Sequence, residues 1–264
     1  MAVFFIFIFG LAVGSFLNVL IHRLPKGESI LGFSKCQHCR RTIYWSDNIP
    51  VLSFLILKGK CRHCGQEISW QYPLVELLTG FLFLFSFWVY PEEPIFLIYI
   101  LFLMSLLVVI GLIDLKKFLI LDSLILTGLI GSLIFMFLFN VSCLKFQELT
   151  SCSFRDSLFG VLFFAGLFLL IFLMSKGRGI GFGDVKFSAL LGFIFGLINS
   201  INLFYLTFLI GFIIAIILLA FKKSDLKTEI PLGSIMAGTG ILLLLSGFNL
   251  FGIIDINFIL RLFY

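Results

Sequence analysis

Runs of about 20 apolar residues recur along this chain and constrain its fold more than any other feature. A helix needs about 20 such residues to cross the hydrocarbon core of a bilayer. Apolar residues make up 61% of the 264-residue chain and charged residues only 12%, about half the charged fraction of soluble domains. We therefore expect an all-α polytopic membrane protein. In such a protein the net charge of +5 reports membrane topology and does not indicate nucleic-acid binding.

The apolar runs predict about eight transmembrane helices. The first run, about 3–21, is followed by His22 and Arg23 and preceded by no basic residue, which is the reverse of a secretory signal. It is expected to be a retained span with its N-terminus outside. No internal repeat is evident along the chain. The other spans are expected at about 74–91, 95–113, 118–139, 157–175, 187–199, 202–221 and 235–254, with a polar break at 199–202.

The distribution of basic residues supports this orientation. The predicted cytoplasmic loops hold 16 of the 19 Lys and Arg residues, which leaves only Lys145, Arg155 and Arg261 outside. The chain then divides into a first transmembrane helix (1–22), a cytoplasmic cysteine-rich module (23–73) and a large transmembrane domain (74–264).

A glycine-rich stretch breaks the apolar pattern just before Asp184. Gly177, Gly179, Gly181 and Gly183 fall within seven residues, and each glycine costs a helix about 1 kcal/mol relative to alanine. Irregular backbone at a membrane is tolerated only where protein or a watery cavity surrounds it, and an ionisable residue there is a functional candidate. The stretch could be a mobile gate or a fixed loop.

Asp114, which ends the third span, is expected at the same cytoplasmic edge as Asp184. Two carboxylates that lie close together cannot both ionise and share one proton. One could then activate a water molecule while the other polarises a peptide carbonyl, as in an aspartic protease. Such a pair titrates as a unit, so neither residue is given a fixed role. The alternative is that the two aspartates only pair with Lys117 and Lys186 or reach toward water.

Four of the six cysteines form two C-x-x-C pairs in the cysteine-rich module, Cys36 with Cys39 and Cys61 with Cys64. Two such pairs suit a structural zinc ion held by four thiolates. A short polar segment also has too little core to fold unaided, and a metal would supply the missing stability. The alternatives are redox dithiols or unliganded thiols, although a cytoplasmic location disfavours stable disulfides.

The two remaining cysteines, Cys143 and Cys152, lie in a predicted outer loop. They could form a disulfide outside the cytoplasm. Two free thiols are an equally open possibility, because spacing in the sequence does not determine geometry.

Several sequence boxes resemble the type IV prepilin leader peptidases, a family of membrane aspartyl proteases. Gly181-Phe182-Gly183-Asp184 fits their G-x-G-D signature, and the longer run to Lys186 resembles G-x-G-x-G-D-x-K. Upstream, Asp114 and the run Ile120-Leu121-Asp122-Ser123 resemble the first aspartate box, with Leu121 where the family commonly has proline. Further matches are Gly14 to Pro25, Tyr72 to Gly80, and Ile230-Pro231-Leu232-Gly233.

The resemblance implies that Asp114 and Asp184 are the catalytic pair and that 74–264 is the peptidase domain. Asp122, Gly181, Gly183 and Lys186 would have supporting roles, although Asp122 could simply be a satisfied polar residue. The implied substrates are type IV prepilins or pseudopilins with a short basic leader, cut at the cytoplasmic face of the bacterial inner membrane. Membrane lipid is the other expected partner, and no nucleic acid is expected.

The resemblance also implies N-methylation of the new N-terminus with S-adenosylmethionine. The cysteine module, which archaeal preflagellin peptidases lack, favours this second activity. The resemblance places Glu76, just inside the second span, beside that module; a polar anchor paired with a basic loop residue is the alternative. Two other function classes stay open, namely a transporter or channel with aspartates along an ion path, and a membrane scaffold whose zinc module binds a partner.

Overall fold

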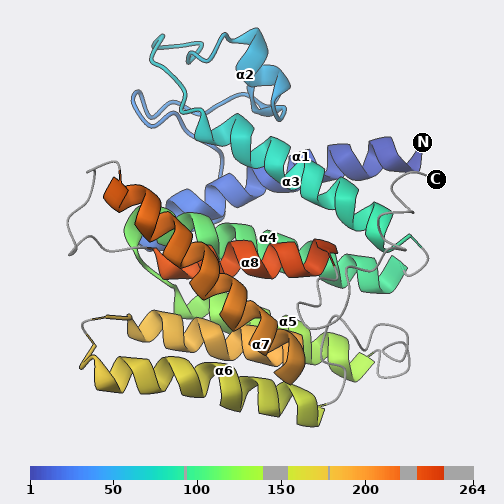
Figure 1. The fold of residues 1–264 in the computed structure, drawn as a ribbon. Coiled ribbons are helices and arrows are strands. Elements are labelled where there is room, and N and C mark those ends of the chain that lie inside the picture. Colours follow the sequence, from blue (N-terminus) through green and yellow to red (C-terminus); the bar gives the residue numbers. More distant parts are fainter. Residues whose placement is uncertain (92–93, 139–153, 178, 221–230, 247–264) are drawn as a thin grey trace. The chain divides into compact units, whose positions relative to one another are not determined.

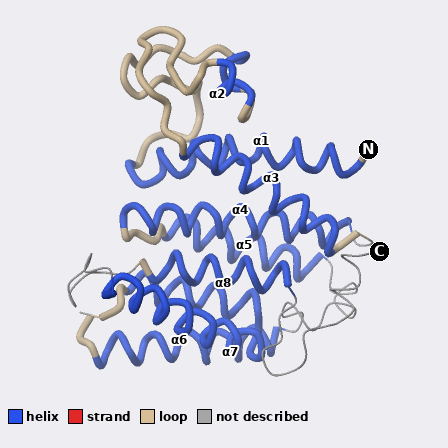
Figure 2. Tube along the Cα trace, turned by 45° about the horizontal axis from the view of Figure 1, so that its top comes forward, coloured by secondary structure: helices blue, strands red, loops and turns tan. Residues whose placement is uncertain are grey.

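The computed structural model describes residues 1–91, 94–138, 154–177, 179–220 and 231–246. The chain divides into two compact units, Met1–Val109 and Ile110–Tyr264. Within the described residues the secondary structure is helical, and the extended pairing consists of two isolated bridges, Lys35 with Thr42 and Lys60 with Glu67 (Figure 2). The all-helical prediction is confirmed.

The first unit is built on two long helices, α1 (Ala2–Arg23) and α3 (Gln71–Val89), which lie side by side (Figure 1). Their close approach depends on small residues. A Cβ atom on Gly10 would lie 2.8 Å from the Cα of Gly80, and one on Gly14 would lie 2.7 Å from the Cα of Glu76. Gly10 and Gly14 form a G-x-x-x-G face, a common device for bringing membrane helices into backbone contact.

The segment between α1 and α3 is mostly loop (Figure 2). It contains the short helices η1 (Leu24–Lys26), η2 (Trp45–Asn48) and α2 (Leu52–Ile56). Two side chains of α3 attach this segment to the helices. The hydroxyl of Tyr72 accepts a hydrogen bond of 2.6 Å from Gln37, and the carboxylate of Glu76 accepts one of 2.8 Å from the backbone N–H of Val51.

The helix α4 (Pro94–Lys117) crosses the division between the two units. The second unit continues with α5 (Asp122–Leu138), α6 (Phe154–Met174), α7 (Phe182–Ala220) and α8 (Leu232–Ser246). Its helices α6 and α7 pack closely against each other (Figure 1). Gly160 of α6 faces Gly192 and Gly196 of α7. A methyl group on Gly160 or on Gly192 would overlap the backbone of the other helix.

The break expected at 199–202 is wrong, because α7 is helical through those residues. Asn199, Ser200 and Asn202 are buried polar residues of the helix rather than parts of a loop. The helix is instead interrupted at Gly196, whose φ of 71° lies in the region that favours glycine. The N–H of Leu197 bonds to Asp156 of α6 at 3.3 Å. Figure 1 shows the two arms of α7 running in different directions from this point.

Five helices are long and apolar enough to cross a membrane, namely α1, α3, α4, α6 and α7. The helices α5 and α8 are apolar but shorter over their described residues. Each predicted apolar run therefore contains described helix, although the run predicted from 118 becomes helical only at Asp122, and the protein is an integral membrane protein by length and composition. The number of eight spans and their orientation stay predictions.

Candidate active site and metal centre

Asp114 lies near the end of α4 and is 4% exposed. Its Oδ2 atom accepts hydrogen bonds from Ser234, at 2.6 Å from the backbone N–H and 3.0 Å from the hydroxyl. The same hydroxyl lies 2.8 Å from the carbonyl oxygen of Gly111. Ser234 belongs to the first turn of α8, where backbone N–H groups have no partner inside the helix. The start of α8 therefore fixes one oxygen of this buried carboxylate.

Asp184 lies in the first turn of α7 and is half-buried. Its Oδ2 atom accepts a hydrogen bond of 3.1 Å from the backbone N–H of Gly181, while its own N–H donates to the Gly181 carbonyl at 3.1 Å. A side chain at the third helical position that bonds back to the residue before the helix is half of a capping box. The G-x-G-D spacing thus orients the aspartate by capping the helix that carries it.

The other glycines of the stretch also have local structural reasons. Gly177 has a φ of 72° and closes the end of α6, with its N–H bonded to the Phe172 carbonyl at 2.9 Å. The rings of Phe172 and Phe182 then pack 5.6 Å apart, so that α6 and α7 meet across the stretch. Gly183 allows close approach, because a Cβ there would lie 3.2 Å from the Cβ of Ile120.

Ile120 brings the two aspartates to the same place. Its side chain lies against Gly183, the residue before Asp184, and against Gly233, where a Cβ would be 2.9 Å from the Ile120 Cδ1 and 3.0 Å from the Asp114 Cγ. The carboxylates of Asp114 and Asp184 lie within electrostatic range of each other. Residues 70 positions apart in the sequence therefore form one acidic pair.

Lys186, one of the two lysines proposed as alternative partners of the aspartates, pairs with a different carboxylate. Lys186 bonds to Asp122, the first residue of α5, at 2.7 Å, and its ammonium lies 5.3 Å from the centre of the Phe182 ring. Among the described residues no ion pair joins a lysine to Asp114 or Asp184. Asp122 and Lys186 are both exposed at the side-chain level and link α5 to α7 beside the pair.

The cysteines lie in two turns of the same construction. The Cys36 N–H bonds to the Arg41 carbonyl and the Cys61 N–H to the Gln66 carbonyl, at 2.9 and 2.8 Å. Each turn contains one residue whose backbone is in the left-handed conformation, Arg40 with a φ of 57° and Gly65 with a φ of 69°. The expectation of no internal repeat is wrong for this segment, since Lys-Cys-x-His-Cys recurs at 35–39 and 60–64. The repeat is too short to stand out without the paired turns.

The four sulfur atoms of these turns, from Cys36, Cys39, Cys61 and Cys64, lie within 4.8 Å of one another, and all four are free thiols. The Cys36 and Cys64 sulfurs are 3.9 Å apart. Four thiolates at about 2.3 Å from a tetrahedral zinc ion are separated by about 3.8 Å. The cluster could therefore bind a metal, and its dimensions fit zinc. Cys143 and Cys152 lie outside the described residues.

The ionisation of these thiols is uneven. The backbone N–H groups of Cys64 and His63 donate to the Cys61 sulfur and lower the pKa of Cys61 to about 7. Although the Gln66 N–H donates to Cys64, loss of solvent and the neighbouring sulfurs raise the pKa of Cys64 to about 11. Crowded thiols cannot all ionise without a compensating cation, and a divalent metal ion supplies that charge.

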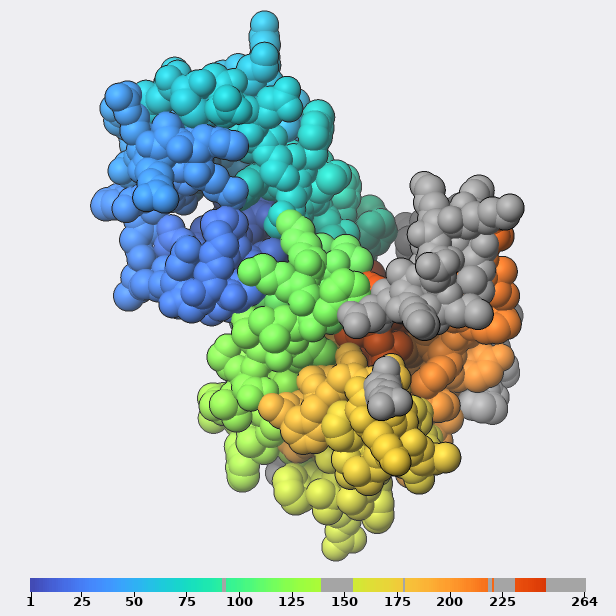
Figure 3. Space-filling model, turned by 90° about the vertical axis from the view of Figure 1, so that its left-hand side faces the viewer, coloured from blue at the N-terminus to red at the C-terminus, as the bar shows by residue number. Residues whose placement is uncertain are grey.

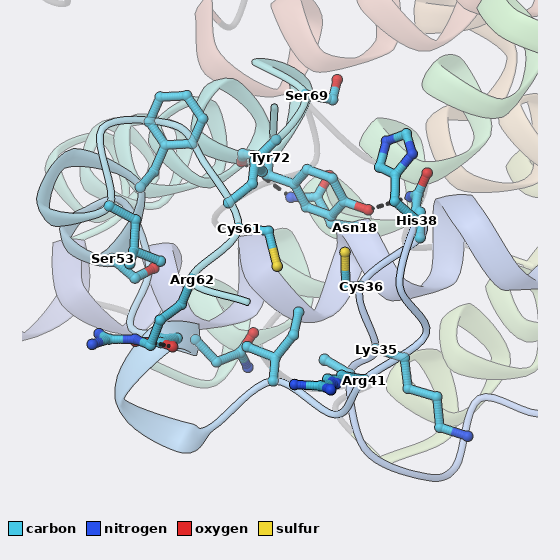
Figure 4. Close-up of a pocket in the computed structure, with 18 of the residues that line it drawn as sticks. Asn18, Lys35, Cys36, His38, Arg41, Ser53, Cys61, Arg62, Ser69 and Tyr72 are labelled. Carbon is cyan, nitrogen blue, oxygen red and sulfur yellow. Dashed lines mark hydrogen bonds and ion pairs between the residues drawn. The ribbon is translucent and has the colours of Figure 1, made fainter. Parts of the chain in front are cut away.

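A cavity of about 260 Å³ lies beside the cysteine cluster, within the first unit. Figure 3 shows the hollow between α1 and the cysteine-rich segment, in the darker and lighter blues. Figure 4 shows Asn18 and Tyr72 from the helices, with Cys36 and Cys61 from the two turns. Glu76 also lines it and is 7% exposed. Its carboxylate bonds to Val51, and the alternative, an ion pair with a basic loop residue, does not occur among the described residues.

Comparison with known proteins identifies the family. Residues 101–219, which include both aspartates, match the type IV leader peptidase family, and residues 8–90 match the bacterial peptidase A24 N-terminal domain. The chain belongs to the type IV leader peptidase family. The resemblance inferred from the sequence boxes is confirmed, and the transporter hypothesis gains no support from these matches.

Relatives from this family cover most of the chain. A prepilin leader peptidase/N-methyltransferase of Klebsiella pneumoniae is 41% identical over 196 residues, which are 71% of this chain and 82% of the relative. Proteins of the same name from Pectobacterium carotovorum and Pseudomonas aeruginosa are 34% and 32% identical, covering 92% and 90% of this chain and 93% and 88% of the relatives. No solved structure matches this chain.

Two residues of the site went unnoticed in the sequence. Ser234 follows directly after the Ile230-Pro231-Leu232-Gly233 box, and that box is the sequence signal for its position beside Asp114. Val51 gave no signal, because a β-branched residue is a rare choice for its φ of 60°. Only the fold shows that its N–H is directed at Glu76.

Proposed function

We propose that this protein is a membrane aspartyl endopeptidase that removes the short basic leader of type IV prepilins or pseudopilins. The observation that carries the proposal is the acidic pair itself. Asp114 and Asp184 come from different helices and meet beside Ile120, within the region that matches the leader peptidase family. The names of the relatives supply the reaction and the substrate class.

The geometry suits water-mediated hydrolysis. Two carboxylates that share one proton can act on both reactants. The ionised carboxylate takes a proton from water, and the protonated one offers its proton to the oxygen of the peptide carbonyl. The water oxygen bonds to the carbonyl carbon, the carbon–nitrogen bond breaks, and the leaving amine takes up a proton from the pair. Ser234 and Gly181 each hold one carboxylate oxygen through a backbone N–H, which leaves the second oxygen of each aspartate for water and substrate.

The expected location of the pair is the cytoplasmic face of the bacterial inner membrane. Lys116 and Lys117 lie two and three residues after Asp114, and Lys176 precedes the glycine stretch. Basic residues near the ends of spans favour the cytoplasmic side. A prepilin inserted in the same bilayer would present its basic leader and scissile bond at this depth.

Loss of cleavage in aspartate variants tests the proposal. Asp114→Asn and Asp184→Asn preserve side-chain volume but remove the shared proton chemistry, so each should abolish cleavage of a co-expressed prepilin. Glu28→Gln changes an exposed carboxylate outside both sites and is the matched control. Equal protein levels in the membrane are required for the comparison. Cleavage at the normal rate by either aspartate variant would remove the acidic pair from the mechanism.

We further propose that the cysteine cluster holds a structural zinc ion and that the protein methylates the new N-terminus. The four sulfur positions support the metal, and the N-methyltransferase names of the relatives support the second activity. S-adenosylmethionine would supply the methyl group. The bond between this methyl group and sulfur would break as the lone pair of the amine forms the new carbon–nitrogen bond, and the amine would lose one proton. Mass spectrometry of the N-terminus of the processed pilin tests the methylation, since an unmethylated product would limit the enzyme to proteolysis.

A further inference from the structure

The short helix α2 presents an apolar face that no described residue covers. Leu52, Leu55 and Ile56 occupy the i, i+3 and i+4 positions, which share one face of a helix. Their exposed fractions are 56%, 63% and 73%. Phe54, on the opposite face, is buried and packs against Trp70, with the ring centres 4.9 Å apart. A contiguous exposed face of large aliphatic side chains marks an interaction surface.

A hydrogen bond to α3 places α2 beside a membrane span. The N–H of Val51, the residue before α2, donates to the Glu76 carboxylate at 2.8 Å. Glu76 lies in the second turn of α3, about 7.5 Å along the helix axis from Gln71, the first residue of α3. The helix α3 is long and apolar enough to cross a bilayer over its whole length. Figures 1 and 2 show α2 alongside α1 rather than beyond its end.

The residues around the apolar face are those typical of a membrane interface. Trp70, directly before α3, is 69% exposed, and Trp45, in the neighbouring helix η2, is 83% exposed. Tryptophan is enriched where a bilayer meets water. Lys58 and Lys60 follow α2, are exposed, and form no ion pair with a described carboxylate. Since residues 49–60 include no acidic residue, this surface is positive and complements anionic phospholipid.

We propose that Leu52, Leu55 and Ile56 insert into the bilayer interface, with Lys58 and Lys60 at anionic phospholipid head groups. Interfacial helices bury their apolar face about 5–10 Å into the boundary between head groups and acyl chains, and the bond to α3 holds α2 at such a depth. Three aliphatic side chains are few for a free protein, but α1 and α3 already keep α2 at the membrane. The cysteine-rich segment is then partly embedded in the bilayer rather than wholly in the cytoplasm.

This surface lies in the first unit and uses neither aspartate of the acidic pair, so its test needs no cleavage activity. Leu55→Trp is made in a full-length protein whose native tryptophans, Trp45, Trp70 and Trp88, are replaced by phenylalanine. The protein is reconstituted in vesicles of phosphatidylglycerol brominated on the acyl chains near the head groups. Bromine quenches a tryptophan that touches the acyl chains, whereas iodide quenches one in water. We expect most of the fluorescence to be lost in the brominated lipid and little of it to be lost to iodide.

Variants of this fluorescent protein separate the apolar face from the charge. Ile56→Asp should withdraw the tryptophan from lipid, so that quenching by bromine falls and quenching by iodide rises. Leu31→Asp is the matched control, because it introduces the same charge at a residue that is 82% exposed but lies outside α2, and it should change neither value. Lys58→Gln combined with Lys60→Gln should lower quenching by bromine, and so should brominated phosphatidylcholine in place of phosphatidylglycerol.

Two results would contradict this arrangement. Quenching by iodide without quenching by brominated lipid would overturn the insertion of α2 and leave its apolar face to a protein partner. Equal quenching by the two brominated lipids would overturn the assignment of anionic head groups to the lysines. Thermal unfolding of each variant at the temperature of the parent protein shows that a change in quenching does not come from loss of the fold.

Discussion

Replacement of Gly233 by alanine should damage the acidic pair directly. A Cβ at this position would lie 3.0 Å from both Cγ and Oδ2 of Asp114 and 2.9 Å from the Cδ1 of Ile120. Carbon atoms in contact are normally about 3.5–4.0 Å apart, so the neighbours must move by about 0.5–1 Å. The Ile120 methyl can rotate away. The Asp114 carboxylate is held by two bonds from Ser234 on the same helix turn, so it would shift with that turn or lose those bonds.

A displacement of about 1 Å at a reacting group can lower a rate by about 10²-fold. We therefore expect purified Gly233→Ala to cleave a prepilin about 100-fold more slowly than the wild type in a single-turnover assay. The substitution should not unfold α8, because alanine is favoured over glycine in helices by about 1 kcal/mol. Zinc content of the first unit should be unchanged.

Gly238→Ala is the matched control for this experiment. It lies on the same helix, and a Cβ there would meet no described atom within 4 Å. Its cleavage rate should equal that of the wild type. The double variant Gly233→Ala with Ile120→Ala removes the contact with the isoleucine but not the contact with the carboxylate, so it should stay slow. Recovery in the double variant, or a normal rate in Gly233→Ala alone, would refute the reasoning.

Three further outcomes follow from the contacts. Gly160→Ala should destabilise the protein by about 1–3 kcal/mol or more, because its methyl group would overlap the Gly192 carbonyl. Thermal unfolding in detergent measures this loss of stability. Gly166→Ala is the control, because its methyl group would meet no described atom within 4 Å. Lys186→Met breaks an exposed ion pair with Asp122, so a double-mutant cycle should give a coupling below about 1 kcal/mol; a larger coupling would mean that the pair is more than a surface link. Cys36→Ser should reduce bound zinc well below one ion per chain in elemental analysis, and full zinc occupancy would contradict four-thiolate binding.

The sequence by itself determined the class of fold and the chemistry of the candidate residues. Runs of about 20 apolar residues leave helices as the structure that satisfies the backbone inside a bilayer. Within each C-x-x-C pair the two thiols lie in one turn of the backbone, so local spacing alone brings two metal ligands together. The G-x-G-D box behaves in the same way, because Gly181 and Asp184 meet through the local geometry of a helix start.

Only the tertiary structure decided which distant residues meet. Sequence spacing cannot show that Ile120 lies between Gly183 and Gly233, or that Ser234 of α8 holds Asp114 of α4. It also misplaced the interruption of α7, since polar Asn199 and Asn202 are typical of loops, whereas here they are buried in the helix and Gly196 carries the irregular backbone.

The partners of the carboxylates show the same limit. Lys186 follows Asp184 by two residues, yet it pairs with Asp122, which is 64 positions away. Glu76 forms no ion pair with a basic residue in the described part of the chain, and its carboxylate accepts hydrogen bonds from the Val51 backbone and the Ser15 hydroxyl. A sequence specifies which groups can ionise and which backbone stays helical. The packing of helices through small residues such as Gly14 and Gly160 determines which groups come within reach of one another.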